Sequence, residues 1–205
     1  MEYVFRSTNF AGVLREARDF FDSLELLEKK TTERFAGAGV YGLYYFGDST
    51  LYKQCKNDGV RGEYPIYIGK AVPPGSRRGV ESNTSDSCHA LWKRIKEHFG
   101  SIDSAHNLHQ DEFKFKAMVM HHPEIELISG VESHLIRIHN PLWNAVVDGF
   151  GNHTPGNGRF EQAKSDWDVI HPGRLFADKC RGEHKSEESI KQRIREWENR
   201  NLGSR

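Results

Sequence analysis

Apolar positions recur along the chain with two periods, and each period predicts one type of element. Spacings of three and four over residues 11–30 predict an amphipathic helix whose apolar face consists of Val13, Leu14, Ala17, Phe20, Phe21, Leu24 and Leu27. Three later segments are rich in β-branched and aromatic residues or alternate polar with apolar positions. This pattern predicts strands over 39–47, 64–71 and 112–120.

Further helices are predicted between and after these strands. We expect one helix over 88–99 with Gly100 as its stop, and another that begins at Pro123 and ends near Asn140. A last helix is predicted over 187–200. Residues 149–174, here called the arm, are rich in Gly, Asn, His and Pro, and we expect a long ordered loop there.

Composition narrows the class of protein. The chain has 205 residues, a length that fits one domain over 1–205, and its 29 Lys and Arg balance 29 Asp and Glu. No run of 18 apolar residues and no apolar N-terminal signal region is present, and the three cysteines are widely spaced. We therefore expect a cytoplasmic protein with no membrane partner. The zero net charge hides an excess of six basic over three acidic residues within 70–98.

One carboxylate interrupts an apolar helix face. Glu132 lies beside Ile128 and Leu135 in the helix predicted after Pro123. A carboxylate removed from water at such a place needs a cation, a metal ion or a proton. The alternative is a side chain that reaches solvent or pairs with a structural arginine.

Two further pairs of polar residues are candidates for a site. Arg94 and His98 are four residues apart on one helix face, where together they could bind a phosphate. Tyr41 and Tyr67 lie in the first two predicted strands, and antiparallel pairing would bring both hydroxyls to one face. The alternatives are two surface side chains for the first pair and cross-strand packing for the second.

The order of these residues resembles the GIY-YIG nuclease family. The resemblance rests on GVY at 39–41, YIG at 67–69 followed by Lys70, Arg94 on the next helix, Glu132 on a later helix and a downstream Asn144. It covers about 39–144, with Val40 in place of the motif's Ile and a long link of 25 residues between the two motif tyrosines. His98 and the segment WDVIHPGR at 167–174 are similar to the restriction-enzyme branch of the family.

The resemblance implies a fold and an activity. The implied fold is α+β, a small three-stranded mixed or antiparallel sheet flanked by helices, with the core at 39–144, the N-terminal helix 11–30 and the extension 149–205 outside it. The implied activity is that of a type II restriction endonuclease that cuts double-stranded DNA at a GC-rich palindrome of the CCGCGG kind. The alternatives are a nicking nuclease of the repair or homing type and a non-catalytic DNA-binding module of the same fold.

The resemblance also implies a role for each motif residue. Glu132 would bind one Mg²⁺ or Mn²⁺, Arg94 would stabilise charge on the phosphate, and Asn144 would fix local geometry. Tyr41 is the first candidate for the general base, with Lys70, His98 and the metal ion as helpers, and Tyr67 would orient water or phosphate. Because one module has one site and a palindrome is two-fold symmetric, we expect a homodimer on DNA through the helix 11–30 and the arm.

Recognition of a DNA sequence requires contacts between the protein and base edges, and these must come from residues outside the catalytic motifs. Arginine pairs with guanine in the major groove, so the arginines of the two long loops are the candidates. We expect DNA contacts from Lys70, Arg77, Arg78, Arg159 and Arg174. The alternative for each is a contact to phosphate without sequence information.

Overall fold

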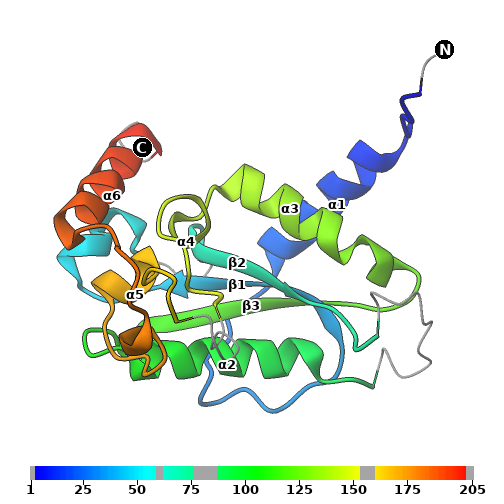
Figure 1. The fold of residues 1–205 in the computed structure, drawn as a ribbon. Coiled ribbons are helices and arrows are strands. Elements are labelled where there is room, and N and C mark those ends of the chain that lie inside the picture. Colours follow the sequence, from blue (N-terminus) through cyan, green and yellow to red (C-terminus); the bar gives the residue numbers. More distant parts are fainter. Residues whose placement is uncertain (1–2, 59–61, 76–86, 153–159, 202–205) are drawn as a thin grey trace.

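Three antiparallel strands form one sheet in the order β2–β1–β3 (Figure 1). The strands are β1 (Ala38–Tyr45), β2 (Pro65–Ala71) and β3 (Phe113–Met120). The computed structural model describes residues 3–58, 62–75, 87–152 and 160–201. The α+β prediction with three strands is confirmed, and the sheet is antiparallel throughout. Since β1 lies between its two partners, β2 forms one edge of the sheet.

Helices cover both faces of this sheet. On one face lies α2 (Ala90–Ser104), whose Leu91, Ile95 and Phe99 pack with Leu43 and Phe115. On the other face lie α1 (Phe10–Ser23) and α3 (Ile128–His139). The side chains there are Leu14, Phe21, Val40, Ile68, Met118, Val131 and Leu135. Alternate residues of β1 therefore serve two separate cores, as the period of two in a strand requires.

The C-terminal part extends the core on the α2 side. It contains the short helices α4 (Leu142–Ala145) and α5 (Asp166–Ile170) and the longer helix α6 (Glu187–Asn201). Three tryptophans, Trp143, Trp167 and Trp197, bury their rings here with Ile190 and Ile194. The 3-10 turns η1 (Thr50–Cys55), η3 (Gln110–Glu112), η4 (Glu124–Leu127) and η5 (Ala177–Lys179) connect the elements.

The predicted helix over 11–30 is too long, because α1 ends at Ser23. Leu24 is already extended, and Leu27 makes a two-bond β-bridge with Phe115 on the outer edge of β3 (N–O distances of 2.7 and 2.9 Å). Leu27 is thus apolar because it packs beside the sheet. Leu27 fits the helical spacing without belonging to the helix, and its pairing with Phe115 of β3 requires an extended backbone.

Three other boundaries differ from the prediction. Helix α2 continues past Gly100 to Ser104, because Ile102 is buried and extends the apolar face by one turn. After Pro123 the chain forms η4 before α3 begins at Ile128. The arm, predicted as a loop, contains helix α5, which Ser165 caps. Among the described residues, no helix is long and apolar enough to cross a membrane.

Candidate active site

Antiparallel pairing brings the two motif tyrosines to the same face. Tyr41 is opposite Gly69, and Leu43 is opposite Tyr67, so both tyrosines point toward α2. Their ring centroids are 6.2 Å apart. Gly69 makes this possible, because a Cβ atom there would lie 2.5 Å from the Tyr41 hydroxyl and 2.9 Å from the Tyr67 ring.

Helix α2 places Arg94 and His98 over the tyrosines. The His98 ring is buried, with its centroid 5.6 Å from that of Tyr41 and 5.1 Å from that of Tyr67. One turn earlier, Arg94 donates Nη1 to Glu97 Oε2 at 3.1 Å and Nη2 to the Gly151 carbonyl at 2.9 Å. The spacing of four residues therefore does place both side chains at one site, as predicted.

The Glu132 carboxylate reaches the site from the opposite side of β2. Lys70 is opposite Val40, whose side chain belongs to the α3 core, so Lys70 points toward α3. Its Nζ lies 2.6 Å from Glu132 Oε2, and 35% of the Lys70 side chain and 16% of the Glu132 side chain are exposed. The carboxylate beside the apolar face thus has a cationic partner. That partner is Lys70 rather than a structural arginine.

Asn144 completes the outer edge of β2. Its Oδ1 accepts the Ile68 amide and its Nδ2 donates to the Ile68 carbonyl, each at 2.8 Å. The side chain thereby replaces a neighbouring strand at one residue of an edge that would otherwise be unpaired. Ile68 lies between Tyr67 and Gly69, so Asn144 fixes the backbone that carries the YIG motif.

Burial controls the protonation of both tyrosines. It raises the pKa of the Tyr41 phenol well above the ordinary value, Tyr67 adds to the increase, and the Arg94 guanidinium opposes it. Burial likewise raises the pKa of Tyr67, which Arg94 lowers and Glu132 raises. Both phenols are therefore protonated at neutral pH. The pKa of Tyr67 depends on both Arg94, on the α2 side, and Glu132, on the α3 side, so Tyr67 couples the two groups of side chains electrostatically.

Arg174 was predicted to contact DNA, but its side chain lies inside the protein. It is only 5% exposed, and its guanidinium binds Asp168 and backbone carbonyls inside the protein. This prediction is corrected: a buried, fully engaged guanidinium cannot reach a base edge. The other three predicted readers, Arg77, Arg78 and Arg159, lie outside the described residues.

The sequence reasoning also missed a short backbone segment beside the site. Residues 149–152, here called the strap, carry the Gly151 carbonyl that accepts from Arg94 and the Phe150 ring that stacks on His98. The only local signal was the glycine-rich composition at the start of the arm, which indicates a loop without indicating where it packs.

A family comparison joins this geometry to known proteins. A model of the family described as the Eco29kI GIY-YIG domain matches residues 33–198. The chain belongs to the Eco29kI GIY-YIG domain family. This restriction endonuclease family includes the arm and α6 as well as the motif core, since the match extends well past Asn144. No curated protein matches the chain.

A GIY-YIG site of this kind raises the question of a metal ion. Within the described part of the chain, no three His, Cys, Asp and Glu side chains form a metal-binding group. Glu132 is nevertheless a hard oxygen ligand, and Lys70 already places a cation beside it at 2.6 Å. Mg²⁺ commonly uses one or two carboxylates and fills its other positions with water and substrate phosphate. The residues therefore fit one divalent ion bound by Glu132.

Proposed function

We propose that this Eco29kI-type GIY-YIG protein is a type II restriction endonuclease that hydrolyses double-stranded DNA with Mg²⁺ or Mn²⁺. The observation that carries the proposal is the convergence of two groups of side chains at the edge strand β2. Tyr41, Tyr67 and Arg94 approach from the α2 side, and the Lys70–Glu132 pair approaches from the α3 side.

Each side chain supplies one requirement of phosphodiester hydrolysis. Arg94, which the strap and Glu97 hold at its two terminal nitrogens, neutralises charge that develops on the phosphate. Lys70 adds a second positive charge beside Glu132. Tyr67 orients the attacking water or the phosphate. Tyr41 is the proposed proton acceptor, and His98 and Lys70 are the alternatives, because the buried Tyr41 phenol must lose its own proton first.

Glu132 would hold the divalent ion, which supplies a Lewis acid that polarises the phosphate and stabilises the leaving 3′ oxygen. Before DNA binds, Lys70 neutralises the same carboxylate. The expected products carry 5′-phosphate and 3′-hydroxyl ends.

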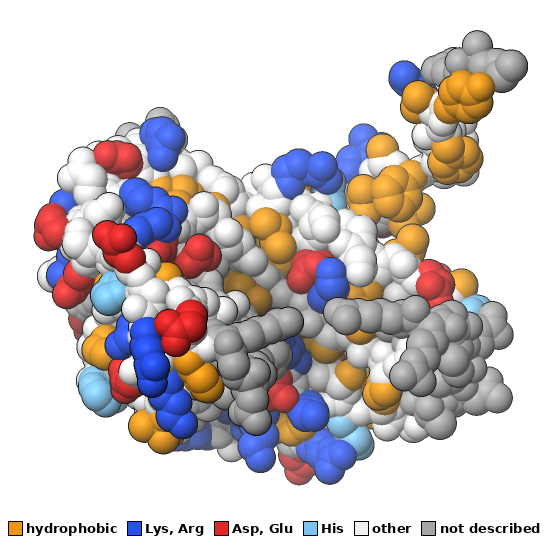
Figure 2. Space-filling view, viewed as in Figure 1, with side chains coloured by type: hydrophobic (Ala, Val, Ile, Leu, Met, Phe, Trp, Pro, Cys, Tyr) orange, Lys and Arg blue, Asp and Glu red, His pale blue; other side chains and the backbone are white. Residues whose placement is uncertain are grey.

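A basic groove beside the site is suited to the DNA backbone. The groove has a volume of about 690 Å³ and extends from the end of β2 along α2. Arg34, Lys93 and Lys96 line it together with Arg94, and the acidic residue among its described lining is Glu97. Lys and Arg side chains gather along the lower edge of the molecule, where α2 lies (Figure 2). We propose that Lys93 and Lys96 contact phosphates on either side of the scissile bond.

The proposal includes a homodimer on a palindromic site. Each chain offers one Glu132 and one Arg94, whereas a double-strand break needs two cuts. Helix α1 is the favoured contact surface, because Phe10 and Phe20 are 43% and 55% exposed. In the arm, Phe150, Trp167 and Ile170 pack inside the protomer, whereas residues 161–163 are exposed, so the arm remains the second proposed contact surface. A cytoplasmic location is kept as part of the same proposal.

The recognition sequence is proposed from the family resemblance alone as a GC-rich palindrome of the CCGCGG kind. The test is incubation of a plasmid that has a single CCGCGG with the protein and Mg²⁺, beside the same plasmid with that site altered. We expect one linear product from the first plasmid and none from the second, and no cleavage by Glu132→Gln. Linear product from both plasmids would refute the site, nicked circles would indicate a nicking enzyme, and intact DNA would indicate a non-catalytic module.

A further inference from the structure

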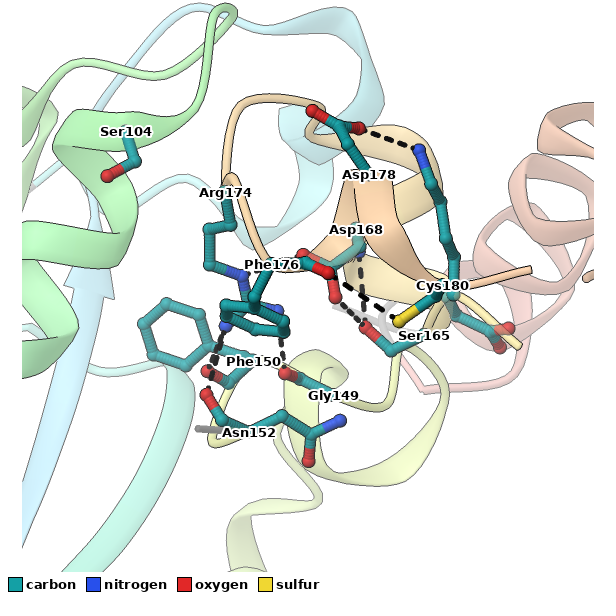
Figure 3. Close-up of polar contacts among 12 residues, drawn as sticks. Ser104, Gly149, Phe150, Asn152, Ser165, Asp168, Arg174, Phe176, Asp178 and Cys180 are labelled. Carbon is teal, nitrogen blue, oxygen red and sulfur yellow. Dashed lines mark hydrogen bonds and ion pairs between the residues drawn. The ribbon is translucent and has the colours of Figure 1, made fainter. Parts of the chain in front are cut away.

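A buried arginine in the arm holds the strap. Arg174 Nε donates to Asp168 Oδ1 at 2.7 Å, and its two terminal nitrogens donate to backbone carbonyls of the strap (Figure 3). Nη2 bonds Gly149 at 2.9 Å, and Nη1 bonds Phe150 at 3.1 Å and Asn152 at 3.3 Å. All three guanidinium nitrogens therefore have partners inside the protein. A buried charge needs such a complete set, because water cannot solvate it.

The strap touches three side chains that are proposed for catalysis. The Gly151 carbonyl accepts Arg94 Nη2 at 2.9 Å. The Phe150 ring stacks on His98 with centroids 4.5 Å apart and meets the Tyr67 ring at 4.9 Å. A displacement of the strap would therefore move Arg94, His98 and Tyr67 together.

The residue before Arg174, Gly173, packs closely against the end of α2. Gly173 has a φ of +143°, and a Cβ atom there would lie 1.8 Å from the Ser104 carbonyl oxygen at the end of that helix. From this contact Arg174 reaches the strap, and the strap returns to Arg94 in the middle of α2 (Figure 3 shows Ser104, Arg174 and the strap residues). Gly173 and the strap therefore contact α2 at two points, Ser104 and Arg94.

Asp168 and two aromatic rings hold Arg174 on its other side. Asp168 belongs to α5, and its Oδ2 accepts the hydroxyl of Ser165, the residue that caps this helix, at 2.7 Å. The guanidinium also lies over the Trp167 ring, 4.5 Å from its centroid, and over Phe176, at 4.9 Å. The position of the guanidinium is thus determined by α5 and by two aromatic rings.

We propose that Arg174, oriented by Asp168, is a positioning residue that fixes the strap so that the Gly151 carbonyl keeps Arg94 aimed at the scissile phosphate. This inference rests on the proposed nuclease function. The long Arg94 side chain has many rotamers, and an error of about 1 Å at a reacting group costs on the order of 10² in rate. Lysine cannot replace Arg174, because a single ammonium nitrogen cannot reach three carbonyls and Asp168 with the planar fork of a guanidinium.

The test compares Arg174→Lys with Arg193→Lys. Arg193 is a matched control, since its guanidinium also joins an acid of α5, Asp166, to a backbone carbonyl, that of Val146 at 2.7 Å. Neither contact involves the strap. We expect Arg174→Lys to lower the single-turnover cleavage rate about 30-fold with an unchanged Kd for DNA, and Arg193→Lys to change the rate less than three-fold. Equal effects of the two variants would overturn the proposal.

A double substitution tests whether Arg174 acts through Arg94. In an Arg94→Lys background, the further change Arg174→Lys should cost clearly less rate than it costs alone. The part of the loss that passes through Arg94 is already gone, and only the part through His98 and Tyr67 remains. Multiplication of the two losses would refute the positioning role. If Arg174→Lys does not fold, Asp168→Asn serves in its place, since it keeps the side-chain volume and removes the negative charge that pairs with the guanidinium.

A readout without catalysis separates this inference from the proposed function. Hydrogen exchange of the peptide that contains the strap should be faster in Arg174→Lys than in the wild-type protein. In Arg193→Lys the exchange of this peptide should be unchanged. Absence of DNA cleavage by the wild-type protein would refute the nuclease proposal, and unchanged exchange in Arg174→Lys would refute the strap proposal.

Discussion

Replacing Gly69 by alanine should damage the active site far more than the fold. The new Cβ would lie 2.5 Å from the Tyr41 hydroxyl and 2.9 Å from Tyr67 Cε1, whereas ordinary contacts begin near 3.4 Å. The Tyr41 hydroxyl must therefore move by about 0.9 Å. Misplacement by about 1 Å at a reacting group costs on the order of 10² in rate, while overpacking a core costs about 1–3 kcal/mol of unfolding free energy.

The assay is single-turnover cleavage of a cognate duplex, together with urea unfolding and the Kd for DNA. Gly100→Ala is the control, because its Cβ meets nothing within 4 Å in the middle of α2. That control should keep full activity and gain up to about 1 kcal/mol, since alanine is the better helix former. Cleavage by Gly69→Ala at the wild-type rate would refute the proposed role of the tyrosine pair. A loss no greater than the unfolded fraction would do the same.

Three other predictions concern protonation and DNA binding. If Tyr41 is the base, its raised pKa requires the cleavage rate to keep increasing with pH from 6 to 9. The cleavage rate of Tyr41→Phe should be lower by at least ~10²-fold. A plateau of the rate near the ordinary histidine pKa of about 6.5 would point to another base. Alanine at Lys93 or Lys96 should weaken binding to cognate and random DNA alike and reduce the salt slope by about 0.9 for each lost contact; a loss confined to cognate DNA would contradict a phosphate role. Burial lowers the pKa of His171 to about 3, so below pH 6.5 the unfolded chain binds a proton that the folded protein does not. The free energy of unfolding should therefore decrease as the pH falls from 6.5 toward 3, and His171→Gln should remove that part of the slope in denaturant titrations; an identical slope in the variant would show that other groups cause it.

His171 belongs to a chain of hydrogen bonds that the sequence did not reveal. Trp143 Nε1 donates to the Tyr52 hydroxyl at 3.1 Å, and this hydroxyl bonds His171 Nε2. On its other side, His171 Nδ1 bonds Asn107 Oδ1 at 2.8 Å. Because Nδ1 must donate to that oxygen, Nε2 accepts from Tyr52, and the neutral ring satisfies both partners. The four residues come from separate segments, so only folding brings them together.

The sequence by itself determined the candidate site residues and the strands that carry two of them. Local spacing marked Tyr41, Tyr67, Arg94 and Glu132 as candidates, because a strand places alternate residues on one face and a helix places residues four apart on one side. The resemblance to the GIY-YIG family joined them into one proposed site. The three strand predictions deviate from the observed limits by one or two residues at most, since dense β-branched and aromatic runs between glycines leave few alternatives.

Only the tertiary structure decided which partners those residues have. Leu27 fits a helical spacing yet bridges Phe115, Glu132 pairs with Lys70 across β2, and Arg174 turns inward to the strap although it was predicted to contact DNA. Each of these contacts joins residues at least 22 positions apart or depends on which side of a loop faces the core. Local periodicity carries no information about such pairings. They result from the packing of whole elements, which buries Arg174 where its charge must find Asp168 and three carbonyls.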